Sequence, residues 1–313
     1  MTSPASLTIP WGGSGRLALD LPDRWERVEA FEPDLSGVLA DYPSALALAL
    51  EEPRESPALG ELVGPGAKVA LVVDDPSRWT PVREALPLIL DRLRASGVSD
   101  ADVSVSVGVG RHHAVDDLAM RRRVGDEVVG RFRCLSPPLD DRSAYADLGM
   151  TSRGIPVRVF RPVAEANLRV LVGSVLPHLQ AGFGGGYKLI FPGTSHRSTL
   201  GALHRRGLDQ GSRGASSPLL GGDAKDNPMR QAIMEAAGML GPCVSVSHLL
   251  GAPGQVLRVL AGAPNPVQDA LAAEARRRFA APVAAKSEAD VVAVGNHPWP
   301  GDPLQSFKVL LQH

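Results

Sequence analysis

The sequence is poor in cysteine, in aromatic residues and in net charge. Its 313 residues include two cysteines and 4% aromatic residues, and the formal net charge is −1. Cys134 and Cys243 lie far apart and form no CxxC motif, which is typical of a protein kept reduced in the cytoplasm. A net charge near zero gives no electrostatic basis for binding nucleic acid or a membrane surface. These scarcities favour a cytoplasmic protein that acts on a small molecule.

Long apolar runs are also missing. No stretch approaches the roughly 18–20 apolar residues that a membrane-spanning helix needs. Residues 1–15 lack the basic start and apolar stretch of a signal peptide, so we expect none. Hydrophobic residues nevertheless make up 44% of the chain, which is enough for a sizeable core. Because single cores stop growing near roughly 250–300 residues, we expect two domains.

Lysine is scarce although basic residues are not. Lysine and arginine together number 33, yet lysine occurs only at positions 68, 188, 225, 286 and 308. One of these, Lys188, lies in the segment PHLQAGFGGGYKLIFPG at 177–193. Arginine would serve if only positive charge were needed there, so the retained lysine indicates a requirement for a primary amine.

The same segment concentrates glycine next to the lysine. Gly182 and Gly184–Gly186 permit positive φ and close backbone approach, and their successive N–H groups can surround an anion. Neither nucleotide-binding motif is complete. GxxxxGK[ST] lacks the glycine before Lys188 and the hydroxyl after it, and GFGGGY lacks the last glycine of GxGxxG. Two interpretations stay open: a phosphate-binding loop, and a glycine turn packed tightly against its neighbours.

From residue 67 the sequence has the pattern of a parallel α/β sheet. AKVALVV at 67–73 and DVSVSVGVG at 102–110 are typical of strands buried on both faces. Between them, residues 81–97 have the apolar spacing of a helix. Because parallel strands in a βαβ unit end at the same edge of the sheet, we expect 74–78 and 108–113 to face each other.

Other elements are predicted before and after this unit. A strand-and-turn lead-in and a helix near 36–50 precede it. Further on we expect a strand at 167–177, a long exposed loop at 205–222, a helix at 228–240, strands near 243–249 and 255–261, a helix at about 264–280, and a strand–loop–helix from 289. The predicted fold class is therefore α/β, with a parallel-sheet domain at 1–262 and an incomplete second α/β domain at 263–313.

Histidines and carboxylates near the strand ends allow a metal site. His112, His113, Asp116 and Asp117 together suit a hard divalent ion, as in a metal-dependent hydrolase. Asp116 and Asp117 equally fit the first turn of the following helix, where acidic residues are normal caps.

Several separated motifs together resemble the nickel-pincer lactate racemase family, from about residue 60 to the end of the sequence. DDPSR is similar to the family's D-x-x-R loop, GRHH to its G-x-H-R loop, PHLQAGFGGGYKLIFPG to its H…GG-x-K…PG signature, and LQSFK to its Q-x-x-K pair. The positions that match are Asp75, Arg78, His112, His178, Lys188, His204, Gln305 and Lys308.

The resemblance implies a 2-hydroxy acid racemase or epimerase that carries a nickel pincer pyridinium mononucleotide. Lys188 would tether the cofactor as a thioamide, Gly184, Gly185 and Gly186 would hold its phosphate, and His204 would bind nickel, which suits neutral imidazole. Hydride would move reversibly from the substrate Cα to the cofactor, while His112 and His178 act as acid and base on opposite faces. Of the remaining matched residues, Arg78 and Lys308 would bind the substrate carboxylate. Gln305 forms the Q-x-x-K pair with Lys308, and Asp75 would orient a cofactor hydroxyl or Arg78.

The sequence also departs from the family pattern. His113, Trp79 and Leu304 stand where arginine, proline and an aromatic residue are usual, which leaves room for a 2-hydroxy acid other than lactate. Family chains continue well beyond the Q-x-x-K helix, so we expect a shortened second domain. The alternative is a relative that binds the cofactor or a phosphorylated ligand with little turnover. Cofactor maturation enzymes are the partners that the resemblance implies.

Overall fold

The computed structural model describes residues 6–11, 15–20, 33–211, 221–251 and 254–280. These residues belong to two compact units, one of residues 35–277 and one of residues 1–34 with 278–313. In the second unit, strands β1 (Ser6–Trp11) and β2 (Gly15–Asp20) pair as an antiparallel hairpin, which agrees with the predicted lead-in. The predicted domain at 263–313 lies largely outside the described residues, so its boundary stays a prediction.

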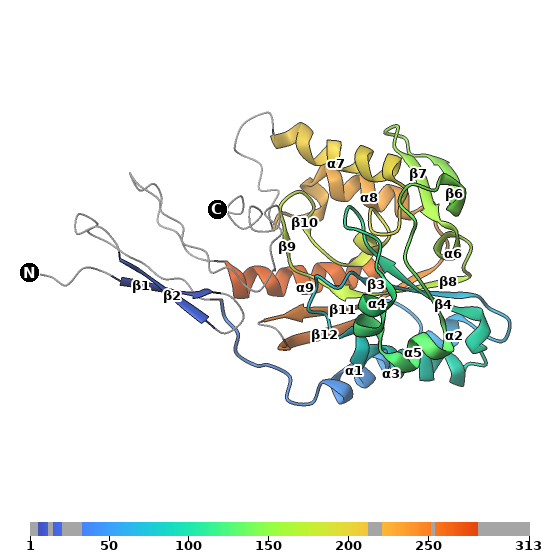
Figure 1. Cartoon of the computed structure of the whole chain (residues 1–313), viewed down its shortest axis with the longest axis horizontal. Coiled ribbons are helices and arrows are strands. Elements are labelled where there is room, and N and C mark those ends of the chain that lie inside the picture. The colour runs from blue at the N-terminus through green and yellow to red at the C-terminus, as the bar shows by residue number, and fades with distance from the viewer. Residues whose placement is uncertain (1–5, 12–14, 21–32, 212–220, 252–253, 281–313) are drawn as a thin grey trace, which may run out of the picture. The chain divides into compact units, whose positions relative to one another are not determined.

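A six-stranded sheet organises the unit 35–277 (Figure 1). Its strands, in spatial order, are β12 (Val256–Gly262), β11 (Cys243–Leu250), β8 (Leu168–Ser174), β3 (Val69–Asp74), β4 (Val103–Gly108) and β5 (Arg133–Leu135). Only the pairing of β12 with β11 is antiparallel among these strands. The α/β class and the parallel pairing of the two predicted strands are confirmed. Because Asp74 pairs with Gly108 and Ser174 with His248, four strands end at one edge.

Helices cover both faces of this sheet. One hydrophobic cluster contains residues of α1 (Tyr42–Glu51), α2 (Leu59–Leu62), α3 (Val82–Ala95), α4 (Asp117–Val124) and α5 (Asp126–Arg131). The other cluster contains residues of strands β6 (Tyr145–Met150) and β7 (Pro156–Phe160) and of helices α6 (Arg161–Ala164), α7 (Arg197–Gly211) and α8 (Pro228–Ala237). Helix α9 (Pro264–Phe279) follows β12. None of the described helices is long and apolar enough to cross a membrane.

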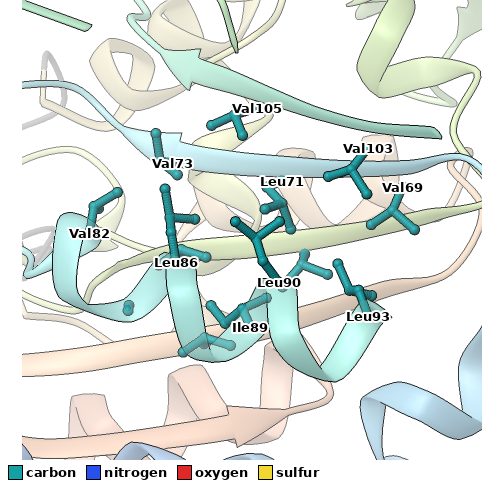
Figure 2. Packing of buried hydrophobic residues seen from close by; sticks show 14 of the residues in the cluster. Val69, Leu71, Val73, Val82, Leu86, Ile89, Leu90, Leu93, Val103 and Val105 are labelled. Carbon is teal, nitrogen blue, oxygen red and sulfur yellow. The ribbon is translucent and has the colours of Figure 1, made fainter. Parts of the chain in front are cut away.

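Strand β3 shows how the two clusters share the sheet. Val69, Leu71 and Val73 belong to the first cluster and Ala70 and Val72 to the second, because successive side chains of a strand point to opposite faces. Figure 2 shows the first cluster, in which α3 lays its apolar residues against the odd-numbered positions of β3. Each large side chain buried in this way contributes about 1.5–3 kcal/mol. Packing against both faces therefore holds β3 in place and fixes the position of its carboxyl end.

One predicted loop is wrong in part. Residues 205–211, expected at the start of a long exposed loop, form the last turns of α7. The glycine that signals a loop here, Gly207, is buried, and a Cβ at this position would lie 2.9 Å from the Gln180 side chain. Gly207 therefore permits close helix packing rather than a turn. Residues 212–220 of the predicted loop lie outside the described residues.

Candidate active site

The loops that follow β3, β4 and β8 meet at one edge of the sheet. A Cβ added to Gly108 at the end of β4 would lie 2.8 Å from the Leu189 carbonyl oxygen, and one added to Gly173 in β8 would lie 3.0 Å from the Leu189 side chain. The Gly110 N–H also donates to the Gly193 carbonyl at 2.9 Å. The segment after the glycine run therefore crosses the edge in contact with both strands, which requires glycine at these positions.

The loop after β3 brings three predicted residues together. Nδ1 of His112 lies 3.2 Å from Oδ1 of Asp75, and Nε of Arg78 lies 3.8 Å from Oδ2 of the same carboxylate. Burial alone would raise the pKa of Asp75, but the hydrogen bond from His112 and the charges of Arg78 and His112 lower it to about 2. Asp75 is thus a buried carboxylate at neutral pH. The predicted approach of 74–78 to 108–113 is confirmed.

A buried arginine that the sequence analysis did not single out supports this loop. Arg123 of α4 forms an ion pair with the Asp74 carboxylate and donates from Nε to the Asp74 carbonyl at 2.9 Å. Its Nη1 donates to the carbonyls of Arg78 and Thr80, each at 3.0 Å. Burial lowers the pKa of Arg123 to about 9, so the guanidinium stays charged at neutral pH. The available signal was helical spacing, because Arg123 lies on the buried face that also carries Met120 and Val124.

The glycine loop after β8 is held by backbone contacts. It begins with a short hairpin of β9 (Pro177–His178) and β10 (Gly182–Phe183). Gly185 and Gly186 have φ of 75° and 54°, and a Cβ on Gly185 would lie 2.6 Å from the Ser174 carbonyl oxygen. The Gly184 N–H donates to the Leu176 carbonyl at 2.7 Å. Tight packing of a glycine turn, one of the two open interpretations, is therefore present.

The same turn also retains donors for an anion. Within the described part of the chain, no acceptor faces the N–H groups of Gly185 and Gly186. Adjacent N–H groups in a turn with positive φ form the concave donor site that binds phosphate in proteins. A packed turn is therefore compatible with the predicted phosphate site, because the Cβ positions of Gly185 and Gly186 face protein atoms while their N–H groups have no acceptor among the described residues.

Lys188 lies in a short 3₁₀ turn, η3 (Gly186–Leu189), directly after these glycines. Its N–H donates to the Gly185 carbonyl and its carbonyl accepts from the Gly193 N–H, each at 3.1 Å. Leu189, Ile190 and Phe191 are buried in the second cluster and anchor the turn. The side chain of Lys188 is half-buried. The backbone of the predicted tether is therefore fixed on both sides.

The two remaining predicted histidines make different hydrogen bonds. Nδ1 of His178 accepts from the N–H groups of Gln180 and Ala181, each at 3.2 Å, so the proton of a neutral ring resides on Nε2. Nδ1 of His204, on α7, lies 2.8 Å from the Leu200 carbonyl oxygen, to which it donates. A neutral His204 therefore keeps the lone pair on Nε2, the arrangement usual for metal-binding imidazoles.

The alternative metal cluster receives no support. Asp116 caps α4 by accepting from the Ala119 N–H at 2.7 Å, and Asp117 pairs with Arg121 at 2.8 Å. No group of three histidine, cysteine, aspartate or glutamate side chains suited to a metal exists among the described residues. The carboxylates act as helix-terminal residues, as their position in the first turn allowed. Gln305 and Lys308 lie outside the described residues.

Comparison with known proteins gives a family match over most of the chain. A family model described as the lactate racemase N-terminal domain matches residues 13–215. A curated lactate racemase from Thermoanaerobacterium thermosaccharolyticum is 29% identical over 203 residues, which cover 64% of this chain and 47% of the relative. The lactate racemase of Lactiplantibacillus plantarum is 28% identical over 156 residues, covering 50% of this chain and 37% of the relative. The chain therefore spans about half the length, or less, of these relatives.

Solved structures share the fold. The lactate racemase apoprotein from Thermoanaerobacterium thermosaccharolyticum superposes with a TM-score of 0.74 at 24% identity, covering 86% of this chain and 62% of that one. A Thermotoga maritima protein gives a TM-score of 0.60 at 17% identity, covering 75% and 58% of the two chains.

Proposed function

Because the chain belongs to the family defined by the lactate racemase N-terminal domain, we propose that it interconverts the two configurations of a small 2-hydroxy acid. The observation that carries this proposal is the group formed by Asp75, Arg78 and His112 at the sheet edge. It combines a cation for the substrate carboxylate with a histidine oriented by a buried carboxylate. Those are the groups needed to hold a 2-hydroxy acid and to deprotonate its hydroxyl.

His112 is proposed as the base that accepts the substrate hydroxyl proton in one direction of the reaction. The Asp75 carboxylate faces Nδ1 of the ring at 3.2 Å, which favours the tautomer with hydrogen on Nδ1 and the lone pair on Nε2. Nε2 would accept the hydroxyl proton, and the Asp75 charge would stabilise the imidazolium that results. Arg78, whose side chain is 36% exposed, presents a guanidinium that suits bidentate contact with the substrate carboxylate.

His178 is proposed as the corresponding group on the other face of the substrate. Its contacts differ from those of His112, because its Nδ1 accepts two backbone N–H groups. In this arrangement Nε2 carries the proton and donates a hydrogen bond. For His178 to act as a base through Nε2, the ring must leave the N–H groups of Gln180 and Ala181. The two directions of the reaction therefore place unequal demands on the two histidines.

The residues also fit the nickel pincer nucleotide that the family resemblance implies. Lys188 offers a primary amine on a fixed turn, Gly185 and Gly186 have N–H groups without an acceptor among the described residues, and His204 keeps a lone pair on Nε2. Lys188 would hold the group covalently, Gly184–Gly186 its phosphate, His204 the nickel and Asp75 a hydroxyl. When bound, the group supplies the hydride acceptor that cleavage of the Cα–H bond needs, which no side chain provides.

The test uses protein produced together with the proposed partners, the cytoplasmic enzymes that assemble the cofactor. Single enantiomers from a panel of 2-hydroxy acids are incubated with this protein, and chiral chromatography follows the appearance of the opposite enantiomer. We expect interconversion of at least one acid, and a fall of about 10²–10⁴ in kcat for His112→Ala. His113→Ala, at the exposed neighbouring position, is the matched control. Equal rates for His112→Ala and the wild type would contradict the role of His112.

A further inference from the structure

A pocket of about 360 Å³ lies among the β9–β10 hairpin, α8, α9 and η4 (Ala224–Asp226). Its floor is buried and consists of Ala181, Phe183, Arg230, Gln268 and Ala272. Its more exposed residues are Asp223, Lys225, Asp269 and Arg276. Ala181 and Gln268 adjoin the glycine loop, but Arg230, Lys225, Asp269 and Arg276 were not assigned to the site described above. All of the lining residues lie in the unit 35–277.

The buried floor contains an arginine with unused donors. Arg230 is 4% exposed, and its guanidinium donates from Nη2 to the Phe183 carbonyl. Asp269 is near enough to act on this charge, but in the described part of the chain no carboxylate forms an ion pair with the guanidinium and the Phe183 carbonyl is its one side-chain hydrogen-bond partner. Burial lowers the pKa of Arg230 to about 10, so the group is charged at neutral pH. A buried guanidinium is costly unless an anion compensates it.

The charges around Arg230 indicate how much negative charge a bound anion would carry. Arg276 pairs with Asp223 at 2.9 Å and lies over the Phe183 ring at 5.0 Å, so these two charges compensate each other. Arg230 and Lys225 then face a single carboxylate, Asp269, whose pKa is raised by burial. Among the residues that line the pocket, one positive charge is left in excess. A carboxylate supplies one negative charge, whereas a phosphate supplies about 1.5–2.

We propose that this pocket binds a small organic carboxylate. The carboxylate contacts Arg230 and Lys225, its apolar part lies against Phe183 and Ala272, and a hydroxyl or ammonium group on the ligand donates to Asp269. The volume is at the lower end of the range for small-molecule sites, roughly 300–1,000 Å³, which limits the ligand to a small acid. This site is separate from Arg78 and goes beyond the proposed racemase activity.

The test is calorimetric titration of the full chain, without cofactor, with lactate, alanine, benzoate and inorganic phosphate as separate probes. We expect saturable binding of at least one carboxylate, with a Kd in the millimolar range or tighter. Arg230→Met and Lys225→Met should each weaken it about tenfold or more, through loss of a charge-assisted contact. Lys225 is exposed, so Lys225→Met keeps the test valid even if Arg230→Met does not fold.

A matched control tests whether the pocket, rather than surface charge, binds the ligand. Arg277→Met, at an exposed position of α9 outside the pocket lining, should bind the same carboxylate as the wild type does. Absence of saturable carboxylate binding, saturation by phosphate alone, or an equal loss of binding in Arg277→Met would each overturn the proposal. Because cofactor and turnover are not involved, failure of the racemase assignment leaves this result unaffected.

Discussion

Two loops meet at the same edge of the sheet and are held there by different means. The loop after β3 depends on a side chain from elsewhere, since Arg123 of α4 reaches the carbonyls of Asp74, Arg78 and Thr80. The loop after β8 depends chiefly on its own backbone, through glycines that approach neighbouring carbonyls closely, while Gln268 and Arg230 add donors to its Gly184 and Phe183 carbonyls. The first loop is therefore vulnerable to loss of one distant side chain, and the second to addition of a single Cβ.

The largest effect is expected from Arg123→Met. The change leaves the buried Asp74 carboxylate without the guanidinium that pairs with it, and loss of one member of a buried ion pair costs about 3–5 kcal/mol. Urea denaturation measures the free energy of unfolding. Arg122→Met, at the exposed neighbouring position of the same helix, is the matched control and should stay within about 0.5 kcal/mol of the wild type. Equal losses of unfolding free energy in the two variants would contradict the inference that the Arg123 side chain holds the loop after β3.

Gly185→Ala tests the backbone-held loop. Gly185 has a φ of +75°, and the new Cβ would lie 2.6 Å from the Ser174 carbonyl oxygen, so we expect a loss of about 3 kcal/mol. Gly184→Ala is the matched control, because its Cβ would lie 3.6 Å from the Leu176 carbonyl oxygen, an ordinary van der Waals distance. Thermal and urea unfolding of both variants provide the measurement. If Gly184→Ala were as destabilising as Gly185→Ala, the close approach of Gly185 to the Ser174 carbonyl would not be the reason for its cost.

A smaller effect is expected from pH, through His248 on β11. Its Nδ1 donates to the Gly173 carbonyl at 2.9 Å, just before the glycine loop, and its Nε2 accepts from the Tyr42 hydroxyl at 2.8 Å. Burial lowers the pKa of His248 to about 4. Between pH 6.5 and 4 the unfolded chain therefore binds the proton more readily, and stability falls as the pH falls, by about 2 kcal/mol at pH 5.

The measurement is the free energy of unfolding of the wild type and of His248→Gln at pH 7 and pH 5. His248→Gln should be less stable at pH 7, because it loses one or both hydrogen bonds, but its stability should change less with pH. If the stabilities of the two proteins changed equally with pH, the predicted titration of His248 would be wrong.

The sequence predicted the elements whose apolar spacing is regular. Strands β3 and β4 and helix α3 follow the predicted ranges closely, because burial on both faces of a sheet leaves an unbroken pattern. The end of α7 was missed because Gly207 was taken as a loop signal, whereas its small size permits contact with Gln180. Local composition does not distinguish these two uses of glycine.

The same limit applies to the site. Asp75, Arg78 and His112 were predicted because they match loop motifs of the family that the sequence resembles. Arg123 and Gln268 were missed, although Gln268 donates to the Gly184 carbonyl at 2.8 Å and borders the glycine loop. Their partners lie 49 and 84 residues away in the sequence. Neither pairing leaves a local pattern, so only the folded structure reveals the residues that position the loops.

We propose that the glycine loop is a fixed support for a reactive amine at Lys188. The most direct test is peptide-mapping mass spectrometry of protein produced with the cofactor-assembling enzymes, together with nickel analysis. We predict a mass increase confined to the Lys188 peptide in the wild type, and its absence from Lys188→Arg, which keeps the charge but removes the primary amine. Nickel-containing wild-type protein with unmodified Lys188, or the same mass increase in Lys188→Arg, would contradict the proposed tether at Lys188.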